Sequence, residues 1–187
     1  MTDRRTENLL GTLSLAVADR MRDGLTGAAE AADTDATALS ALDQFLDGAT
    51  IDLLRQVLGL TSSGTVRLVD RLEAAGYVRR GRLGGDGADR RATTVTLTAA
   101  GREAAGKVTG ARRAVLRDAL AVLSPAERER FGELAGRMVA AMVRPAGATR
   151  WMCRLCDLDA CGRPRGECPV AVATGYRPRE DPADRPG

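Results

Sequence analysis

The middle of the chain has the most informative spacing of apolar residues. Thr50 can cap a helix over residues 51–58, and Gly59 can end that helix in a left-handed turn. Thr61 is a second capping residue, and apolar positions recur at helical spacing through residues 62–75. Two short helices separated by one tight turn predict a helix-turn-helix.

A β-hairpin is expected directly after these two helices. Gly76 ends the second helix, and the segment YVRRGRL then alternates apolar and basic residues, as a half-buried strand does. The later segment ATTVTLT is β-branched and alternating, and a charged, glycine-rich tip, GGDGADRR, joins the two. The combination predicts a winged helix-turn-helix, although a charged tip of this kind can also be a simple solvated loop.

Longer helices are predicted on both sides of this unit. Residues 6–30 and 36–47 each carry one apolar stripe before it. After it, Thr98 caps a long helix, and the run SPAE at residue 124 begins a last helix, which Pro145 stops. The expected fold class is therefore mainly α with a small β-hairpin wing, flanked by long N- and C-terminal helices.

Charge and composition narrow the class of protein. Lys and Arg number 28 against 25 acidic residues, and the excess lies within residues 1–150, because the remainder has six of each. Lys107 is the only lysine, so the basic groups are almost all guanidinium, which suits bidentate contacts to phosphate or guanine. The chain has no histidine, which excludes histidine-based catalysis and imidazole zinc sites. Because no nucleotide-binding glycine-rich loop is present either, an enzyme is not expected.

The second helix of the pair and the hairpin tip carry the candidate nucleic-acid contacts. The inward face of the helix is expected to hold the apolar residues Val66, Leu68, Val69, Leu72 and Ala75. Its outer side should present short hydroxyls and arginines, which reach base edges and phosphates in a major groove: Ser62, Ser63, Thr65, Arg67 and Arg71. At the tip, Arg90 and Arg91 are placed to enter a minor groove.

The runs TVRLVDRLEAAGYVRR and DRRATTVTLTAAGRE resemble the MarR family of bacterial transcriptional regulators, whose wing is written D-x-R and closes with L-T-x-x-G. The resemblance implies a dimer of winged-helix subunits that binds a near-palindromic operator in double-stranded DNA. It places the hydroxyls named above and Arg67 at the start of the recognition helix. Asp89 and Arg91 fall on the D-x-R of the wing, where the acid is expected to orient the arginine. Gly64 departs from the family, whose members more often carry Ser or Pro there.

Five parts are expected along the chain. They are an N-terminal dimerisation helix (residues 1–33), a winged helix-turn-helix lobe (34–98), C-terminal dimerisation helices (99–145), a cysteine module (146–172) and a disordered tail (173–187) rich in Pro and charge. The apolar stripes of the terminal helices can close the core of one subunit as well as join two subunits. Because no apolar run approaches the length of a membrane span and no signal-peptide pattern begins the chain, we expect a cytoplasmic protein without a membrane partner.

All four cysteines fall in one short segment with the spacing C-x2-C-x4-C-x6-C-P: Cys153, Cys156, Cys161 and Cys168. In a cytoplasmic protein, such a group is more typical of a metal site than of disulfides. The single C-x2-C and the closing Cys-Pro favour an iron–sulfur cluster of the 4Fe-4S type. Zinc held by four thiolates, and thiols that are redox-active or simply free, stay open as alternatives.

The sequence therefore predicts a dimeric DNA-binding transcriptional regulator that senses redox or iron state through its cysteines. The alternative is a repressor that responds to a small-molecule effector bound between the DNA-binding lobe and the dimer helices, with a structural zinc site in its tail. An enzyme whose cysteines hold an electron-transfer centre is disfavoured, because all four thiols would be consumed as ligands.

Overall fold

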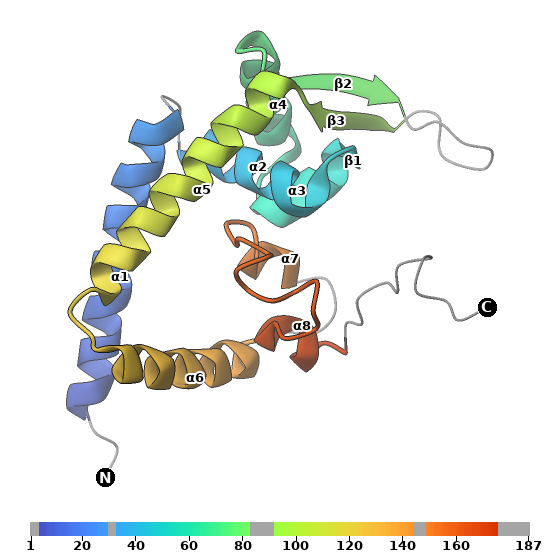
Figure 1. Cartoon of the computed structure of the whole chain (residues 1–187). Helices are drawn as coiled ribbons and strands as arrows, with labels where there is room; N and C mark the ends of the chain where they lie inside the picture. Colours follow the sequence, from blue (N-terminus) through green and yellow to red (C-terminus); the bar gives the residue numbers. More distant parts are fainter. Residues whose placement is uncertain (1–3, 30–32, 83–91, 144–148, 176–187) are drawn as a thin grey trace, which may run out of the picture. The chain divides into compact units, whose positions relative to one another are not determined.

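The computed structural model describes residues 4–29, 33–82, 92–143 and 149–175, which form two compact units, Met1–Val122 and Leu123–Gly187. The chain is mostly helical with one three-stranded antiparallel sheet, which confirms the expected fold class (Figure 1). No helix in the described ranges is both long enough and apolar enough to cross a membrane.

The first unit holds the winged helix-turn-helix. Helices α1 and α5 run side by side, and α2 packs against both of them. Its elements are α1 (Arg4–Ala29), α2 (Asp33–Ala41), the π-helical turn η1 (Leu42–Leu46), β1 (Ala49–Thr50), α3 (Ile51–Leu58), α4 (Ser62–Ala74), β2 (Val78–Arg82), β3 (Thr93–Leu97) and α5 (Ala99–Leu120).

The helix starts expected from the sequence are confirmed. Thr50, Thr61 and Thr98 each accept a hydrogen bond from the backbone N–H three residues later, as N-caps do. Gly59 ends α3 with φ of 66°, the left-handed conformation that favours glycine. The turn between α3 and α4 is therefore fixed locally, before any long-range packing.

The sheet has the strand order β1-β3-β2. In the β2–β3 hairpin, Val78 lies opposite Leu97 and Arg80 lies opposite Val95. The two-residue strand β1 pairs with β3 on the other side and was not predicted, because two residues are too few to show an alternating pattern. Central strand β3 is thus covered on both edges and leads directly into α5.

One predicted helix is interrupted. The helix expected over residues 36–47 begins earlier, at Asp33, and changes at Leu42 into the π-helical turn η1. The wider turn leaves Leu42 and Leu46 both buried, and spacing alone does not distinguish it from a continuous α-helix. Beyond the turn, the Asp47 carboxylate accepts a hydrogen bond from the backbone N–H of Leu97 at 2.9 Å, which joins η1 to β3.

The core of this unit lies between the helices and the inner face of the sheet. Large, fully buried side chains come from six different elements and tie α2, η1, α3, α4, β3 and α5 into one body: Leu39, Leu42, Leu54, Leu68, Leu72, Val69, Val95 and Val108. In the first turn of α5, a Cβ on Gly101 would lie 2.0 Å from the carbonyl oxygen of Tyr77, the residue before β2. Glycine is therefore required for this close approach.

The second unit consists of α6 (Pro125–Ala141), α7 (Thr149–Met152) and α8 (Pro169–Ala173). The expected capping box at the start of α6 is confirmed: the Ser124 hydroxyl accepts from the N–H of Glu127, whose carboxylate accepts from the N–H of Ser124. Helix α6 buries none of its side chains and contacts α8. The residue expected to stop this helix, Pro145, lies outside the described residues.

Candidate nucleic-acid interface and cysteine cluster

The exposed face of α4 is the surface that the sequence analysis assigned to nucleic acid. Ser62, Ser63 and Arg67 are exposed on it, as expected. Arg67 makes no side-chain hydrogen bond or ion pair with a described residue, so its guanidinium is available to a partner. Because these side chains occupy the first turn and a half of the helix, they share the end that also presents free backbone N–H groups.

The expected orientation of two neighbouring residues on α4 is wrong. Thr65, expected outside, is completely buried, and its hydroxyl donates to the carbonyl oxygen of Thr61 at 3.0 Å. Val66, expected inside, is 45% exposed. The buried stripe is set by Leu68 and Leu72, and continuing it back by one helical turn reaches Thr65 and not Val66. Thr65 is therefore unavailable to a base or phosphate. Ala75, also expected inside, is exposed at the C-cap of α4.

Arg71 is held by another helix. Its guanidinium donates two hydrogen bonds to the Asp35 carboxylate of α2, at 3.1 Å from Nε and 2.5 Å from Nη2. The hydrogen bond to Asp35 raises the pKa of Arg71 above its ordinary value. The Asp35 side chain is 8% exposed, whereas that of Arg71 is 51% exposed. The pair therefore braces α4 against α2, and the predicted contact of Arg71 with DNA stays a prediction.

A second brace joins α4 to the hairpin and was missed in the sequence. Arg80 of β2 donates to the carboxylates of Asp70 and Glu73, which lie three residues apart on α4. The hydrogen bond to Asp70 raises the pKa of Arg80. The spacing of the two acids was visible, but their partner depends on how the strand crosses the helix. This network fixes the base of the wing relative to α4.

The N-cap of α4 explains why a glycine stands at position 64. A Cβ added there would lie 3.0 Å from Oγ1 of Thr61, the atom that accepts the hydrogen bond of the Gly64 N–H. Glycine thus leaves room for the capping hydroxyl. The wing residues Asp89, Arg90 and Arg91 lie outside the described residues, and their roles stay predictions.

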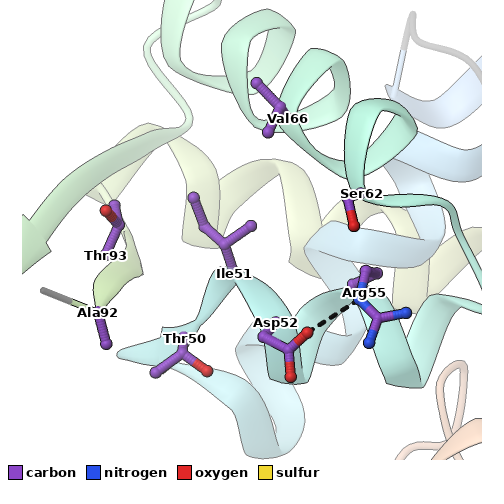
Figure 2. Close-up of a pocket in the computed structure, with 8 residues that line it drawn as sticks. All are labelled: Thr50, Ile51, Asp52, Arg55, Ser62, Val66, Ala92 and Thr93. Atoms are coloured by element: carbon purple, nitrogen blue, oxygen red, sulfur yellow. Dashed lines mark hydrogen bonds and ion pairs between the residues drawn. The ribbon is translucent and has the colours of Figure 1, made fainter. Parts of the chain in front are cut away.

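A hollow of about 360 Å³ opens beside the exposed face of α4 (Figure 2). Its lining combines apolar side chains with hydroxyls and one carboxylate from α3, α4 and the strand edges: Thr50, Ile51, Asp52, Arg55, Ser62, Val66, Ala92 and Thr93. This hollow was not predicted from the sequence, because the first residues of α3 and of β3 come together only in the folded unit.

The four cysteines fall into two pairs in the second unit. The Cys161 thiol donates to Sγ of Cys168, 3.2 Å away, and a hydrogen bond from Cys156 lowers the pKa of Cys153. Burial, together with Cys168, raises the pKa of Cys161 to about 12. Cys153 and Cys168 are buried, while the other two are half-buried. The four thiols form no disulfide.

Tight backbone turns bring the pairs together. Gly162 and Gly166 have φ of 71° and 74°, and a Cβ on Gly162 would lie 2.7 Å from a carboxylate oxygen of Glu167. The N–H of Cys161 donates to the carbonyl oxygen of Asp157 at 3.0 Å. The glycines of this segment therefore permit its compact path, as expected from the sequence.

The donor set suits a thiophilic metal, although the site is not preassembled. Each sulfur lies close enough to the others for Cys168 and Cys161 to influence the pKa of Cys153, and the charge of Arg163 acts on the same group. In the described part of the chain, however, no three Cys, Asp or Glu side chains are arranged as a formed metal site. Metal binding would therefore require the two pairs to converge.

Comparisons with known proteins agree with this architecture. The model of the MarR family matches residues 24–92. A comparison with curated protein sequences gave no significant match. Among solved structures, the chain is similar to a MarR family protein from Bacillus stearothermophilus, with 26% identity and a TM-score of 0.65 over 77% of this chain and 99% of that one.

Two further structures have the same fold. RV1404 from Mycobacterium tuberculosis is 25% identical, with a TM-score of 0.63 over 77% of this chain and 96% of that one. MepR, a transcription regulator of the Staphylococcus aureus multidrug efflux pump MepA, is 17% identical, with a TM-score of 0.61 over 73% of this chain and 98% of that one. The chain therefore has the winged-helix fold of MarR regulators.

Proposed function

We propose that this chain, which has the MarR winged-helix fold, is a MarR-family transcriptional regulator that binds double-stranded DNA. The observation that carries the proposal is the exposed face of α4, where Ser62, Ser63 and Arg67 lie beside a hairpin braced to the same helix by Arg80. Short hydroxyls and a guanidinium that no described residue holds are suited to base edges and phosphates in a major groove. The pair between the exposed Arg71 and the buried Asp35 holds this helix in place and leaves its outer face open.

The active form is proposed to be a homodimer, because a near-palindromic operator requires two copies of the reading helix. Two helices carry large apolar side chains that stay substantially exposed in the described part of the chain. On α1 these are Leu9, Leu10, Leu13 and Leu15, and on α6 and its C-cap they are Phe131, Leu134, Met138, Val139 and Met142. A second copy would bury such stripes, which would otherwise be exposed to water. Light scattering on the purified chain measures the mass directly.

The test of DNA binding is selection from a randomised duplex library with the full chain at one fixed salt concentration. We expect enrichment of a two-fold-symmetric site, with half-sites spaced by about one helical turn. Arg67→Ala should weaken binding to that site, and Arg22→Ala, which removes an exposed arginine of α1, serves as the matched control. Recovery of no preferred sequence would contradict the proposal.

The cysteine cluster is proposed to hold a metal, and the Cys-Pro spacing favours an iron–sulfur cluster over zinc. Cys153, Cys156, Cys161 and Cys168 would supply the thiolates, and Arg163 would offset part of their negative charge. An iron–sulfur cluster, when bound, supplies a centre that responds to oxidants and to iron supply. Sensing of redox or iron state is therefore part of the proposal.

Coupling between the cluster and the dimer would pass through α8. Cys168 is the N-cap of α8, and Pro169 follows it against α6, where a Cβ on Gly136 would lie 3.3 Å from Pro169 Cγ. Convergence of the thiol pairs would move Pro169 and so press on α6, the helix proposed to join two subunits. The gain or loss of metal would then change the affinity for the operator.

This second part is tested by anaerobic purification followed by iron, sulfide and zinc analysis. Iron and acid-labile sulfide in stoichiometric amounts would support the cluster, and zinc alone would indicate a structural site instead. A chain that contains neither metal would contradict the metal site. Gly136→Leu, which crowds Pro169, should reduce the difference in operator affinity between loaded and metal-free protein. Gly132→Leu is the matched control on α6, because nothing lies within 4 Å of a Cβ there.

A further inference from the structure

We propose that the hollow beside α4 is a binding site for the C5-methyl group of a pyrimidine in the DNA major groove, with Val66 as the residue that reads it. The inference rests on the proposed DNA-binding function, because it assigns the same face of α4 to the groove. DNA binding by itself does not say which chemical group of a base the chain selects, and the hollow assigns that group.

The hollow has apolar walls and a polar rim. Val66 of α4, Ile51 of α3 and Ala92 supply apolar surface, while Ser62 and Thr50 place hydroxyls at the edge (Figure 2). A volume of about 360 Å³ is ample for a methyl group together with the edge of its base. The hollow therefore matches an apolar group that is flanked by hydrogen-bonding atoms.

Val66 has no evident role in the fold of its own unit. The buried stripe of α4 is complete without it, because Thr65, Leu68, Val69 and Leu72 make that stripe. A β-branched residue is also less favourable in a helix than alanine. Isolated exposed apolar side chains are common and need no explanation, but Val66 lies at the wall of a hollow and next to Arg67. This combination indicates an apolar partner on the face that meets DNA.

The charges around the hollow are compatible with a base edge. The Asp52 carboxylate accepts hydrogen bonds from Arg55 Nε at 2.9 Å and Gln56 Nε2 at 2.7 Å, and the hydrogen bond from Arg55 lowers its pKa. Its negative charge is thus offset within α3. Arg67, one residue beyond Val66, can hold a phosphate or guanine and so bring the neighbouring base to the hollow.

The major groove offers one apolar group of this size. Thymine carries a C5-methyl next to the O4 acceptor, and 5-methylcytosine carries the same methyl next to an N4 donor. The Ser62 hydroxyl at the rim can donate to the first and accept from the second. Thymine and 5-methylcytosine thus share the C5-methyl group, and the experiment below distinguishes between these two bases.

The test uses the full chain and the duplex that it selects from a randomised library. Each thymine is replaced singly by deoxyuridine, which removes only the C5-methyl, and in a second arm each cytosine is replaced by 5-methylcytosine. We expect at least one position per half-site where the presence of the methyl tightens binding about fourfold, as burial of one methyl group would. Loss on deoxyuridine substitution identifies thymine as the source, and gain on cytosine methylation identifies 5-methylcytosine.

Val66→Ala should reduce the effect of that methyl towards none, and Val66→Thr, which keeps the branched shape, should reduce it partly. Val122→Ala removes an exposed valine elsewhere and should keep the full effect. A wild-type chain that binds its selected site without methyl sensitivity, or a Val66→Ala variant that keeps the effect, would overturn this inference alone. Selection of no preferred duplex would overturn the proposed DNA-binding function and the inference with it.

Discussion

The two compact units of the chain differ in what can hold them together. In the winged-helix unit, helices and sheet converge on buried aliphatic side chains such as Leu54, Leu68 and Val95. In the second unit, α6 buries nothing, and the buried side chains of the described residues are Cys153, Cys168, Val170 and Ala171. So small an apolar core does not stabilise a unit by burial alone. The first unit should therefore fold by itself, whereas the second should depend on what its thiols and α6 bind.

The largest expected effect is loss of order in the second unit when its thiols are prevented from binding metal. Structural thiolate sites contribute on the order of 10 kcal/mol to folding, so Cys168→Ser should abolish amide-exchange protection in α8 and in the turns around Cys161. Protection in α2 to α5 should not change. Ala160→Ser, an exposed substitution in the same segment, is the control. Equal protection of the second unit in wild type and Cys168→Ser would show that the thiols do not stabilise it.

The next effect concerns the core of the first unit. Leu68 is completely buried, so Leu68→Ala should lower the free energy of unfolding of this unit by about 3 kcal/mol. Val122→Ala, at a position of the same unit that is 86% exposed, should change it by less than about 0.5 kcal/mol. Urea denaturation followed by circular dichroism measures both. A loss of free energy of unfolding in Leu68→Ala as small as that of the control would show that the first unit is not held together by its buried core.

A smaller effect is expected from the brace between α2 and α4. Arg71→Ala leaves the buried Asp35 carboxylate without its two donors, and we expect a loss of about 1–2 kcal/mol after screening by water. Adding Asp35→Asn should restore part of this loss. The exposed pair of Arg22 and Asp19 is the control, since Arg22→Ala should have little effect. If both arginine variants are equally stable, the brace does not stabilise α4.

The smallest effect concerns the start of α6. Ser124→Ala removes an N-cap and should cost about 1 kcal/mol of helix stability. Hydrogen bonds from the Ser124 backbone and hydroxyl lower the pKa of Glu127. Their contribution to stability is therefore fully present at pH values above the ordinary pKa of a glutamate, and it is lost as the pH falls through the lowered pKa. In Ser124→Ala, the pKa of Glu127 should rise and this loss at acid pH should diminish. An NMR titration of Glu127 measures the change, and an unaltered pKa would show that the Ser124 hydroxyl does not contribute to its lowering.

The sequence predicted the local features of the fold well. Caps at Thr50, Thr61 and Thr98 and the left-handed turn at Gly59 depend on neighbouring residues, and all four are confirmed. The orientation of α4 was predicted less well: Val66 is the more apolar of the two residues, but Thr65 is the one that is buried. A threonine can be buried when its hydroxyl donates to a backbone carbonyl, as the hydroxyl of Thr65 does to Thr61.

Features that depend on packing between distant segments were not predictable from spacing. The pairing of Arg71 with Asp35, the network of Arg80 and the hollow beside Val66 each join elements far apart in the chain. The cysteine segment was predictable in part. Its spacing gathers the four thiols, but only the structure shows that they form two pairs instead of one preassembled site.

The most direct test of the account is the ratio of affinities for the selected duplex and for a scrambled duplex of the same length, measured by fluorescence anisotropy with the full chain at one salt concentration. We expect the selected duplex to bind at least about a thousandfold more tightly than the scrambled one, and Arg67→Ala to reduce this ratio. Equal affinity for both duplexes would contradict the central claim that α4 reads DNA sequence.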